Sequence, residues 1–279
     1  MAKIAYVSAI INNYEHTAKI HITQSIPTDF VLFTDNPAII NSEHIKIIDA
    51  NKYKYGIDEF IDCNPNMKNN LRTNTHSFMR AKFFKCNLHR IPELREYDYI
   101  VWCDGSIKVH NPLFSEFILE ITKKKPIVLW THHCRNGILK NEVEASIGGN
   151  KYTSTNWYGQ DQPFQDVAQS YLDYCNDGFK ENWFNIYKNV DGQYFNDNSD
   201  LHIGVWCTTY IIFDMRSPLT HKFLDEYWKD TLYHTTQDQV VFSYVCWKLQ
   251  FLPYSLPDET IKGNMYVNPF TCITLGHFL

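Results

Sequence analysis

The sequence of 279 residues predicts a single α/β domain with a mainly parallel sheet. Short apolar runs alternate with stretches of helical composition, the pattern of βαβ units. The run from residue 99 to 103 contains no charged residue, as expected for a strand that is covered on both faces. Asp104 and Gly105 follow at once, at the strand end where open α/β sheets bind their ligands. The alternative for Asp104-Gly105 is a simple turn.

Three further strands are expected before this central one, at residues 3–11, 30–33 and 45–48. The polar stretch after the first strand, to about residue 24, has helical composition. Ser8 and Thr34-Asp35 would lie at neighbouring strand ends, where a hydroxyl and a carboxylate could hold a base and a ribose. Asp35 equally suits the start of a turn before Asn36-Pro37.

A helix predicted over residues 76–90 carries a local excess of basic residues in an acidic protein. A charged helical face is most often only solvated. Because this helix directly precedes the strand that ends at Asp104, it could instead bring cations to that strand end. The basic side chains concerned are Arg80, Lys82, Lys85, His89 and Arg90.

The second half of the chain predicts further alternation of strands and helices. Thr236 and Gln239 have the spacing of a capping box at the start of the last helix. The long polar and aromatic stretch from residue 148 to 178 is interpreted as an excursion from the sheet on the acceptor side, for acceptor binding or a lid. The elements expected are a helix from Pro112 to about residue 125, a strand at 127–130, a strand pair at 201–206 and 208–215, a helix at 219–232 and a helix ending at 249.

Composition excludes several classes of protein. The net charge of −5 provides no broad basic field for nucleic acid or an anionic membrane. Eight cysteines occur singly without a CxxC pair, which argues against a zinc ribbon and favours reduced thiols. Neither a signal peptide nor a membrane span is recognisable, so a cytoplasmic protein is expected. The oligomeric state is left open.

The order of these elements resembles the nucleotide-sugar glycosyltransferases of the GT-A fold, a Rossmann-like fold. In that fold a nucleotide-binding half precedes a strand that ends in an Asp-X-Asp motif, and an acceptor half follows. Thr34-Asp35 resembles the base-binding strand end, Arg80 the arginine before the motif strand, and Asp104-Gly105-Ser106 the motif. The resemblance implies one domain over residues 1–279, with a nucleotide-binding half at 1–110 and an acceptor and catalytic half at 111–279.

Later segments are similar to the glycogenin and galactosyltransferase-like family. His202-Ile203-Gly204 matches a segment close to the donor sugar, Asp238-Gln239 an Asp-Gln pair, and Gly276-His277-Phe278 a C-terminal metal-binding histidine. A second resemblance, to a plant and bacterial glycosyltransferase-like family of formerly unknown function, rests on His89-Arg90 with Pro92, on residues 101–105, and on His133 through Arg135 to Glu142 and Ala145.

The resemblance implies transfer of a sugar from a UDP- or GDP-sugar to a glycan or another hydroxyl acceptor, with a divalent cation, Mn²⁺ or Mg²⁺. Asp104 and His277 would bind the metal, and Asp238 and Gln239 would be catalytic. Asp238 would act as base for the acceptor hydroxyl if the reaction inverts, or as stabiliser if it retains. Ser106 departs from the motif, because it removes one strong metal ligand. Metal binding could then be weak, pass through water, or be replaced by basic residues. The donor-binding residues implied are Ser8, Thr34, Asp35, Arg80, Lys85, Asp104, Gly105, Ser106, His202 and Gly204.

Two other functions stay open at this point. A glycoside hydrolase on a similar sheet would pair Glu142 or Glu144 with Asp238. A non-catalytic sugar- or nucleotide-binding module, which Ser106 makes plausible, would bind a nucleotide without turning over a donor.

Overall fold

The computed structural model describes residues 2–54, 77–148, 167–184 and 203–256, apart from His16, Asn41 and His133. For Phe78 and three short strands between residues 261 and 274 it describes only the backbone.

A seven-stranded sheet with the order β3-β2-β1-β4-β7-β6-β8 forms the centre of the molecule. Every strand except β7 runs parallel to the others. The structure therefore confirms the predicted fold class, a mixed and mainly parallel sheet flanked by helices. The strands are β1 (Ile4–Ile10), β2 (Thr28–Thr34), β3 (Lys46–Asp49), β4 (Tyr99–Cys103), β6 (Ile127–Thr131), β7 (Trp206–Asp214) and β8 (Tyr254–Leu256).

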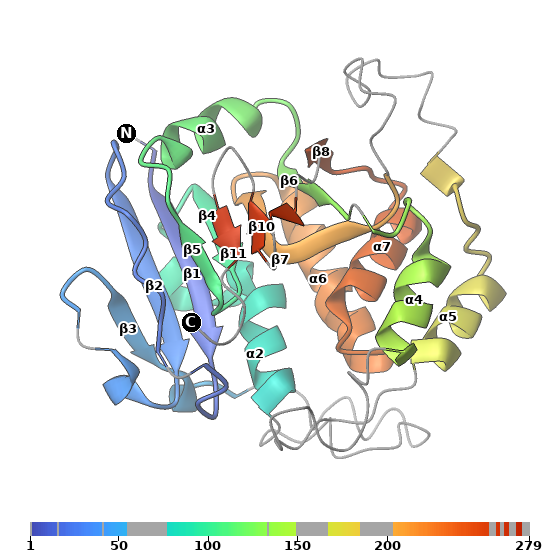
Figure 1. Ribbon diagram of the computed structural model, residues 1–279, viewed down its shortest axis with the longest axis horizontal. Helices are drawn as coiled ribbons and strands as arrows, with labels where there is room; N and C mark the ends of the chain where they lie inside the picture. The colour runs from blue at the N-terminus through green and yellow to red at the C-terminus, as the bar shows by residue number, and fades with distance from the viewer. Residues whose placement is uncertain are drawn as a thin grey trace.

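Helices cover both faces of this sheet. Side chains alternate along β1, so that Val7 packs into the larger apolar core and Tyr6 into the smaller one. The larger core includes apolar residues of α2 (Ser77–Cys86), α4 (Leu139–Gly148), α5 (Val167–Asn176), α6 (Pro218–Tyr233) and α7 (Asp238–Lys248). The smaller core lies against α3 (Phe114–Ile121). In Figure 1 the blue strands β1 to β3 stand on the left and α4 to α7 on the right, with α2 between them.

A second, antiparallel sheet joins the residues after Asp104 to the C-terminal part of the chain. Its order is β5 (Ile107–Val109), β11 (Cys272–Thr274), β10 (Met265–Val267) and β9 (Ile261–Lys262). Thr274 pairs with Ile107 in this sheet. The two sheets therefore connect both predicted halves of the chain, whose division at residue 110 stays a prediction.

Two sequence-based expectations are wrong. Residues 11–24 form no helix, because Asn12 and Asn13 adopt left-handed backbone angles (φ of 56° and 51°). The amide of Ile22 instead donates to the carbonyl of Val109, so this amide is not available for a hydrogen bond within a helix. The expected strand pair after residue 201 is the single strand β7; Ile203 and Gly204 lie in a turn, where Gly204 has φ of +127°.

Helix boundaries also differ from the expectations. The capping box is wrong: α7 begins at Asp238, its N-cap is Gln237, and the Thr235 hydroxyl, not that of Thr236, accepts from the Gln237 amide at 3.1 Å. The helix expected from Pro112 begins two residues later at Phe114. Helix α5 lies within the predicted excursion, of which residues 149–166 fall outside the described part.

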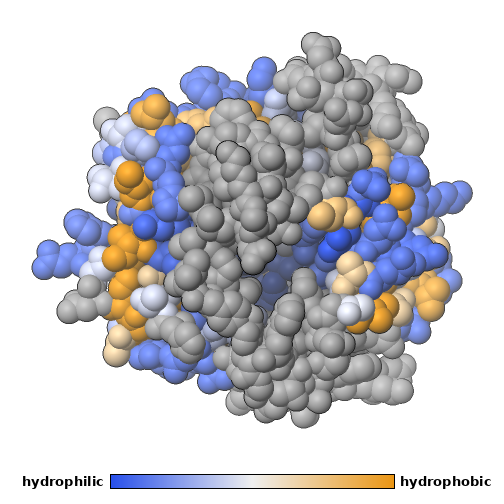
Figure 2. Space-filling view, viewed as in Figure 1, coloured by the Kyte–Doolittle hydropathy of each residue, from blue (hydrophilic) through white to orange (hydrophobic). Residues whose placement is uncertain are grey.

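The surface on the side shown in Figure 2 is mainly hydrophilic where the structure describes it, with a band of apolar side chains on the left. None of the described helices combines the length and the apolar character needed to cross a membrane. Of the described cysteines, Cys86, Cys103 and Cys246 are buried, whereas Cys134 and Cys175 are exposed.

Candidate functional site

Charged side chains meet at the carboxyl edge of the parallel strands, on the face covered by α2. Asp35 follows β2 and Asp104 follows β4. Asp238 comes from the start of α7, and the cations Lys82 and Lys85 come from α2. Open α/β sheets bind ligands at this edge. These charges therefore mark the candidate site.

Lys85 connects two of these carboxylates. Its side chain is completely buried, and its ammonium contacts Oδ2 of Asp238 and lies 3.4 Å from Oδ1 of Asp104. The indole nitrogen of Trp102 donates to the same oxygen of Asp104 at 2.6 Å. Residues 102 and 104 share one side of the strand because side chains alternate along it. The buried lysine thus fixes the spacing between Asp104 and Asp238.

Asp238 is held as a carboxylate by two cations. Lys82 Nζ lies 2.9 Å from Oδ2, the oxygen that Lys85 also contacts. Burial by itself would raise the pKa of Asp238, but the positive charges of Lys82 and Lys85 outweigh it and hold that pKa well below the usual range. Burial likewise acts to lower the pKa of Lys82, but Asp238 and Asp104 raise it overall. Asp238 and Lys82 therefore both stay charged at neutral pH.

One oxygen of each carboxylate is open within the described part of the chain. The contacts of Asp104 use Oδ1, and its side chain is 33% exposed. The side-chain contacts of Asp238 use Oδ2. No described residue bonds to Oδ2 of Asp104 or Oδ1 of Asp238. These two oxygens can accept a hydrogen bond from a hydroxyl group or bind a cation.

Arg80 is paired with Asp35 and not with Asp104. Its guanidinium lies 3.0 Å from Oδ2 of Asp35 and donates to Asn51 at 2.9 Å. The other oxygen of Asp35 accepts from the amide of Asn12 at 2.9 Å. The Thr34 hydroxyl accepts from the Asn36 amide at 3.1 Å, which closes the turn after β2. The donor-binding role of Thr34 stays a prediction, while Asp35 and Arg80 form a second charged pair at the same edge.

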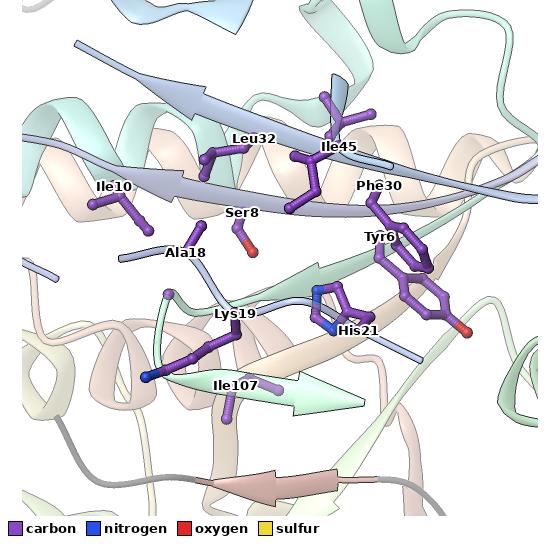
Figure 3. A pocket seen from close by; sticks show the side chains of 12 residues that line it. Tyr6, Ser8, Ile10, Ala18, Lys19, His21, Phe30, Leu32, Ile45 and Ile107 are labelled. Atoms are coloured by element: carbon purple, nitrogen blue, oxygen red, sulfur yellow. The ribbon is translucent and has the colours of Figure 1, made fainter. Parts of the chain in front are cut away.

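Ser8 faces the opposite side of the sheet. Its hydroxyl donates to the carbonyl of Cys103 at 2.7 Å and lines a pocket with Tyr6, Phe30 and His21 (Figure 3). Burial lowers the pKa of His21 to about 4, so the imidazole is neutral there. Ser8 and the two lysines Lys82 and Lys85 therefore lie on opposite faces of the sheet. A donor-binding role for Ser8 stays a prediction.

The glycines and Ser106 of the predicted site are tightly packed. A Cβ on Gly105, which lines the same pocket, would lie 3.0 Å from both Glu15 Cγ and Ile10 Cγ1. A Cβ on Gly204 would lie 2.2 Å from the Gly137 carbonyl oxygen, so close chain packing requires this glycine. Ser106 is buried.

The remaining predicted residues are only partly placed. Gln239 is half-buried in the first turn of α7, beside Asp238. His202 and His277 lie outside the described residues. Their roles as donor ligand and metal ligand stay predictions.

Trp102 was missing from the predicted site residues, and Lys82 was named only among the basic side chains of the predicted helix. Lys82 precedes Lys85 by three positions, which places both on one face of a helix. Trp102 precedes Asp104 by two, which places both on one face of a strand. Both spacings were readable in the sequence, but neither names the partner carboxylate.

The metal-ligating side chains among the described residues fit a divalent cation only if the substrate supplies part of its ligands. Among the described residues no group of three His, Cys, Asp or Glu side chains is arranged to hold a metal. The open Oδ2 of Asp104 is a hard oxygen ligand, of the kind that Mg²⁺ combines with substrate phosphates and water. Lys85 adds a positive charge beside it and disfavours a preformed metal site.

No family model and no curated protein matches the sequence. Solved structures that are similar to it include the following three. The bifunctional glycosyltransferase WbbM (apo) is 13% identical with a TM-score of 0.46, over 88% of this chain and 37% of that one. Mouse xyloside xylosyltransferase 1 (apo) is 10% identical with a TM-score of 0.47, over 91% and 85%. The mannosyltransferase Ktr4p from S. cerevisiae, in complex with GDP, is 12% identical with a TM-score of 0.39, over 91% and 67%.

The chain therefore spans little more than a third of the length of WbbM. Each of the three neighbours bears the name of a glycosyltransferase.

Proposed function

We propose that this protein is a glycosyltransferase that moves a sugar from a nucleoside-diphosphate sugar to a hydroxyl acceptor, such as a glycan. The observation that carries the proposal is the buried Lys85, which connects Asp104 and Asp238 and leaves an open oxygen on each. A nucleotide-sugar has two chemically different ends, a diphosphate and a sugar. Two carboxylates at a set spacing suit these two ends.

Asp104 would serve the diphosphate end. The described cations Arg80, Lys82 and Lys85 are balanced by Asp35, Asp104 and Asp238, so they leave the charge of a diphosphate unmatched. A divalent cation would supply that charge, and Oδ2 of Asp104 would hold it. Arg80 and Asp35 would contact the nucleoside part of the donor.

His277 is the proposed second ligand of that cation. The antiparallel pairing of Thr274 with Ile107 supports it. In an antiparallel register, the position three residues after Thr274, which is His277, corresponds to the position three residues before Ile107, which is Asp104.

Asp238 would serve the sugar end. Its open Oδ1 can accept a hydrogen bond from a hydroxyl of the donor sugar, and its charge can stabilise the oxocarbenium-like transition state. Because the two lysines keep its pKa low, Asp238 is a weak proton acceptor. We therefore assign it electrostatic stabilisation and not general-base catalysis. Gln239 would contact the same sugar.

The hydrolase alternative finds no support at Glu142 or Glu144. Arg135, Gln237 and Ser146 occupy both oxygens of Glu142, which is 1% exposed. The side chain of Glu144 is 62% exposed and lies near Lys140.

The test is a screen of UDP- and GDP-sugars for turnover by mass spectrometry, with thermal-shift measurements of UDP and GDP binding with and without Mn²⁺. Asp104→Asn removes a charge but leaves an acceptor for Trp102. We expect it to reduce metal-dependent nucleotide affinity and turnover by about tenfold or more. Glu144→Gln is the control that removes a surface carboxylate.

If Asp104→Asn retains both properties, the assignment of Asp104 is wrong. Nucleotide binding without turnover of any donor would identify the protein as a non-catalytic binding module.

A further inference from the structure

A buried polar network joins α4, the loop after β6 and the start of α7. Its centre is Glu142, whose Oε2 lies 2.5 Å from the Arg135 guanidinium nitrogen Nε. The Gln237 side-chain amide donates to Oε1 of Glu142 at 2.7 Å and to the Ser146 hydroxyl at 3.0 Å. Ser146 also donates to Oε1 at 3.2 Å. Every oxygen of this buried carboxylate is therefore satisfied, which is the condition for a buried charge to be tolerated.

The network holds the residue that directly precedes Asp238. Gln237 is the N-cap of α7, and its carbonyl accepts from the amides of Val240 and Val241 at 3.0 and 3.2 Å. Its side chain ties this first turn to Glu142 on α4. The Asp238 side chain is tied to α2, and the Tyr227 hydroxyl donates to its carbonyl at 3.2 Å. The position of Asp238 thus depends on Gln237 as well as on the lysines.

We propose that Arg135, Glu142 and Gln237 are positioning residues that set Asp238 against the donor sugar, an inference that rests on the proposed transferase function. Among the described residues, the side chain of Asp104, at the diphosphate end, contacts Lys85 and Trp102 and no member of this network. Loosening the network would therefore lower turnover and leave nucleotide affinity intact, because a misplacement of about 1 Å can reduce a rate about 100-fold. The proposal also gives a role to Glu142, one of the two residues that the hydrolase alternative would have made catalytic.

The experiment exchanges the side chains of Glu142 and Gln237. Gln237→Glu places a second carboxylate against Glu142 and replaces the attractive contact by repulsion. We expect kcat to fall about tenfold or more while the Kd for the nucleoside diphosphate changes less than about twofold. The double variant E142Q/Q237E restores an amide-to-carboxylate contact with its direction reversed. We expect its kcat to return to within about threefold of the wild type.

Hydrogen exchange provides a second readout in the same variants, and it does not depend on turnover. Hydrogen exchange of the Val240 and Val241 amides should accelerate in Q237E and return to the wild-type rate in the double variant. E144Q alters an exposed carboxylate on α4, the helix that contains Glu142, and should change neither kcat nor the exchange rates.

Unchanged exchange and unchanged kcat in folded Q237E would overturn the proposal. So would a double variant that regains its melting temperature but not its kcat. If the wild type turns over no donor, the proposed transferase function fails. The exchange measurement then still decides whether the network holds the start of α7.

Discussion

Two buried aspartates, Asp230 and Asp238, lie close together in the sequence and show opposite electrostatics. They are 3% and 7% exposed, and each pairs with lysine. Burial raises the pKa of Asp230 to about 6, whereas the pKa of Asp238 is held well below its usual range. Similar burial therefore leads to opposite protonation preferences.

The difference comes from the number and placement of the neighbouring charges. Asp230 shares the cation Lys248 with Glu226. The negative charge of Glu226 raises the pKa of Asp230 further. Asp230 also lies in the last turn of α6, where the helix dipole disfavours a negative charge. Asp238 has Lys82 and Lys85 and lies in the first turn of α7, where the dipole favours one. Two lysines thus accompany the carboxylate that we propose to be functional, whereas one lysine, shared with Glu226, accompanies Asp230.

The largest effect is expected from Asp238→Asn. It leaves the buried ammonium of Lys85 with Asp104 as its only carboxylate among the described residues, 3.4 Å away. We expect donor turnover to fall about 100-fold or more and the free energy of unfolding to fall by about 3 kcal/mol. Turnover assays and urea unfolding measure both. Asp230→Asn is the matched control and should change turnover less than about twofold; equal turnover losses in the two variants would contradict the comparison.

Acid should distinguish the same two carboxylates. The pKa of Asp238 in the folded protein lies below its ordinary value of 3.8, so its stabilising effect is complete above that value and is lost as the pH falls through the folded pKa. Unfolding followed from about pH 5 to about pH 2 should show a larger loss of stability in the wild type than in Asp238→Asn. Parallel curves would show that the two lysines do not stabilise the carboxylate.

Asp230 should act in the opposite direction. Its folded pKa of about 6 exceeds the ordinary 3.8, so its contribution is complete below that ordinary value and is lost as the pH rises to about 6. We expect the wild type to lose about 2 kcal/mol of unfolding free energy over this range through Asp230, and Asp230→Asn to lack this loss. Denaturant unfolding at both ends of the range measures it. A wild-type slope that survives in the variant would assign it to another group.

The smallest effect is expected from Glu226→Gln. Removing this negative charge leaves Lys248 to Asp230 alone, so the pKa of Asp230 should fall by a fraction of a unit. An NMR titration of the Asp230 carboxyl measures the change. A rise in that pKa would mean that Glu226 acts mainly by holding Lys248 in place.

Local patterns were sufficient where the interaction that forms an element is local. The apolar runs of β1, β2, β4 and β6 predict strands because a continuous apolar run indicates burial on both faces without any knowledge of the neighbouring strands. Residues 11–24 failed for the converse reason. Their composition suits a helix, but Ile22 bonds to Val109 in a distant part of the chain, and tertiary contacts override propensity.

The sequence by itself determined that Asp104 ends a buried strand and that a basic helix precedes it, because both follow from local periodicity. Only the tertiary structure decided which charges meet. Lys85 and Asp238 are 153 positions apart, and their contact depends on how α2 and α7 pack on one face of the sheet. The same packing turned Ser8 toward the other face. Side chains alternate along a strand, but the face that receives the helices is selected by the whole fold.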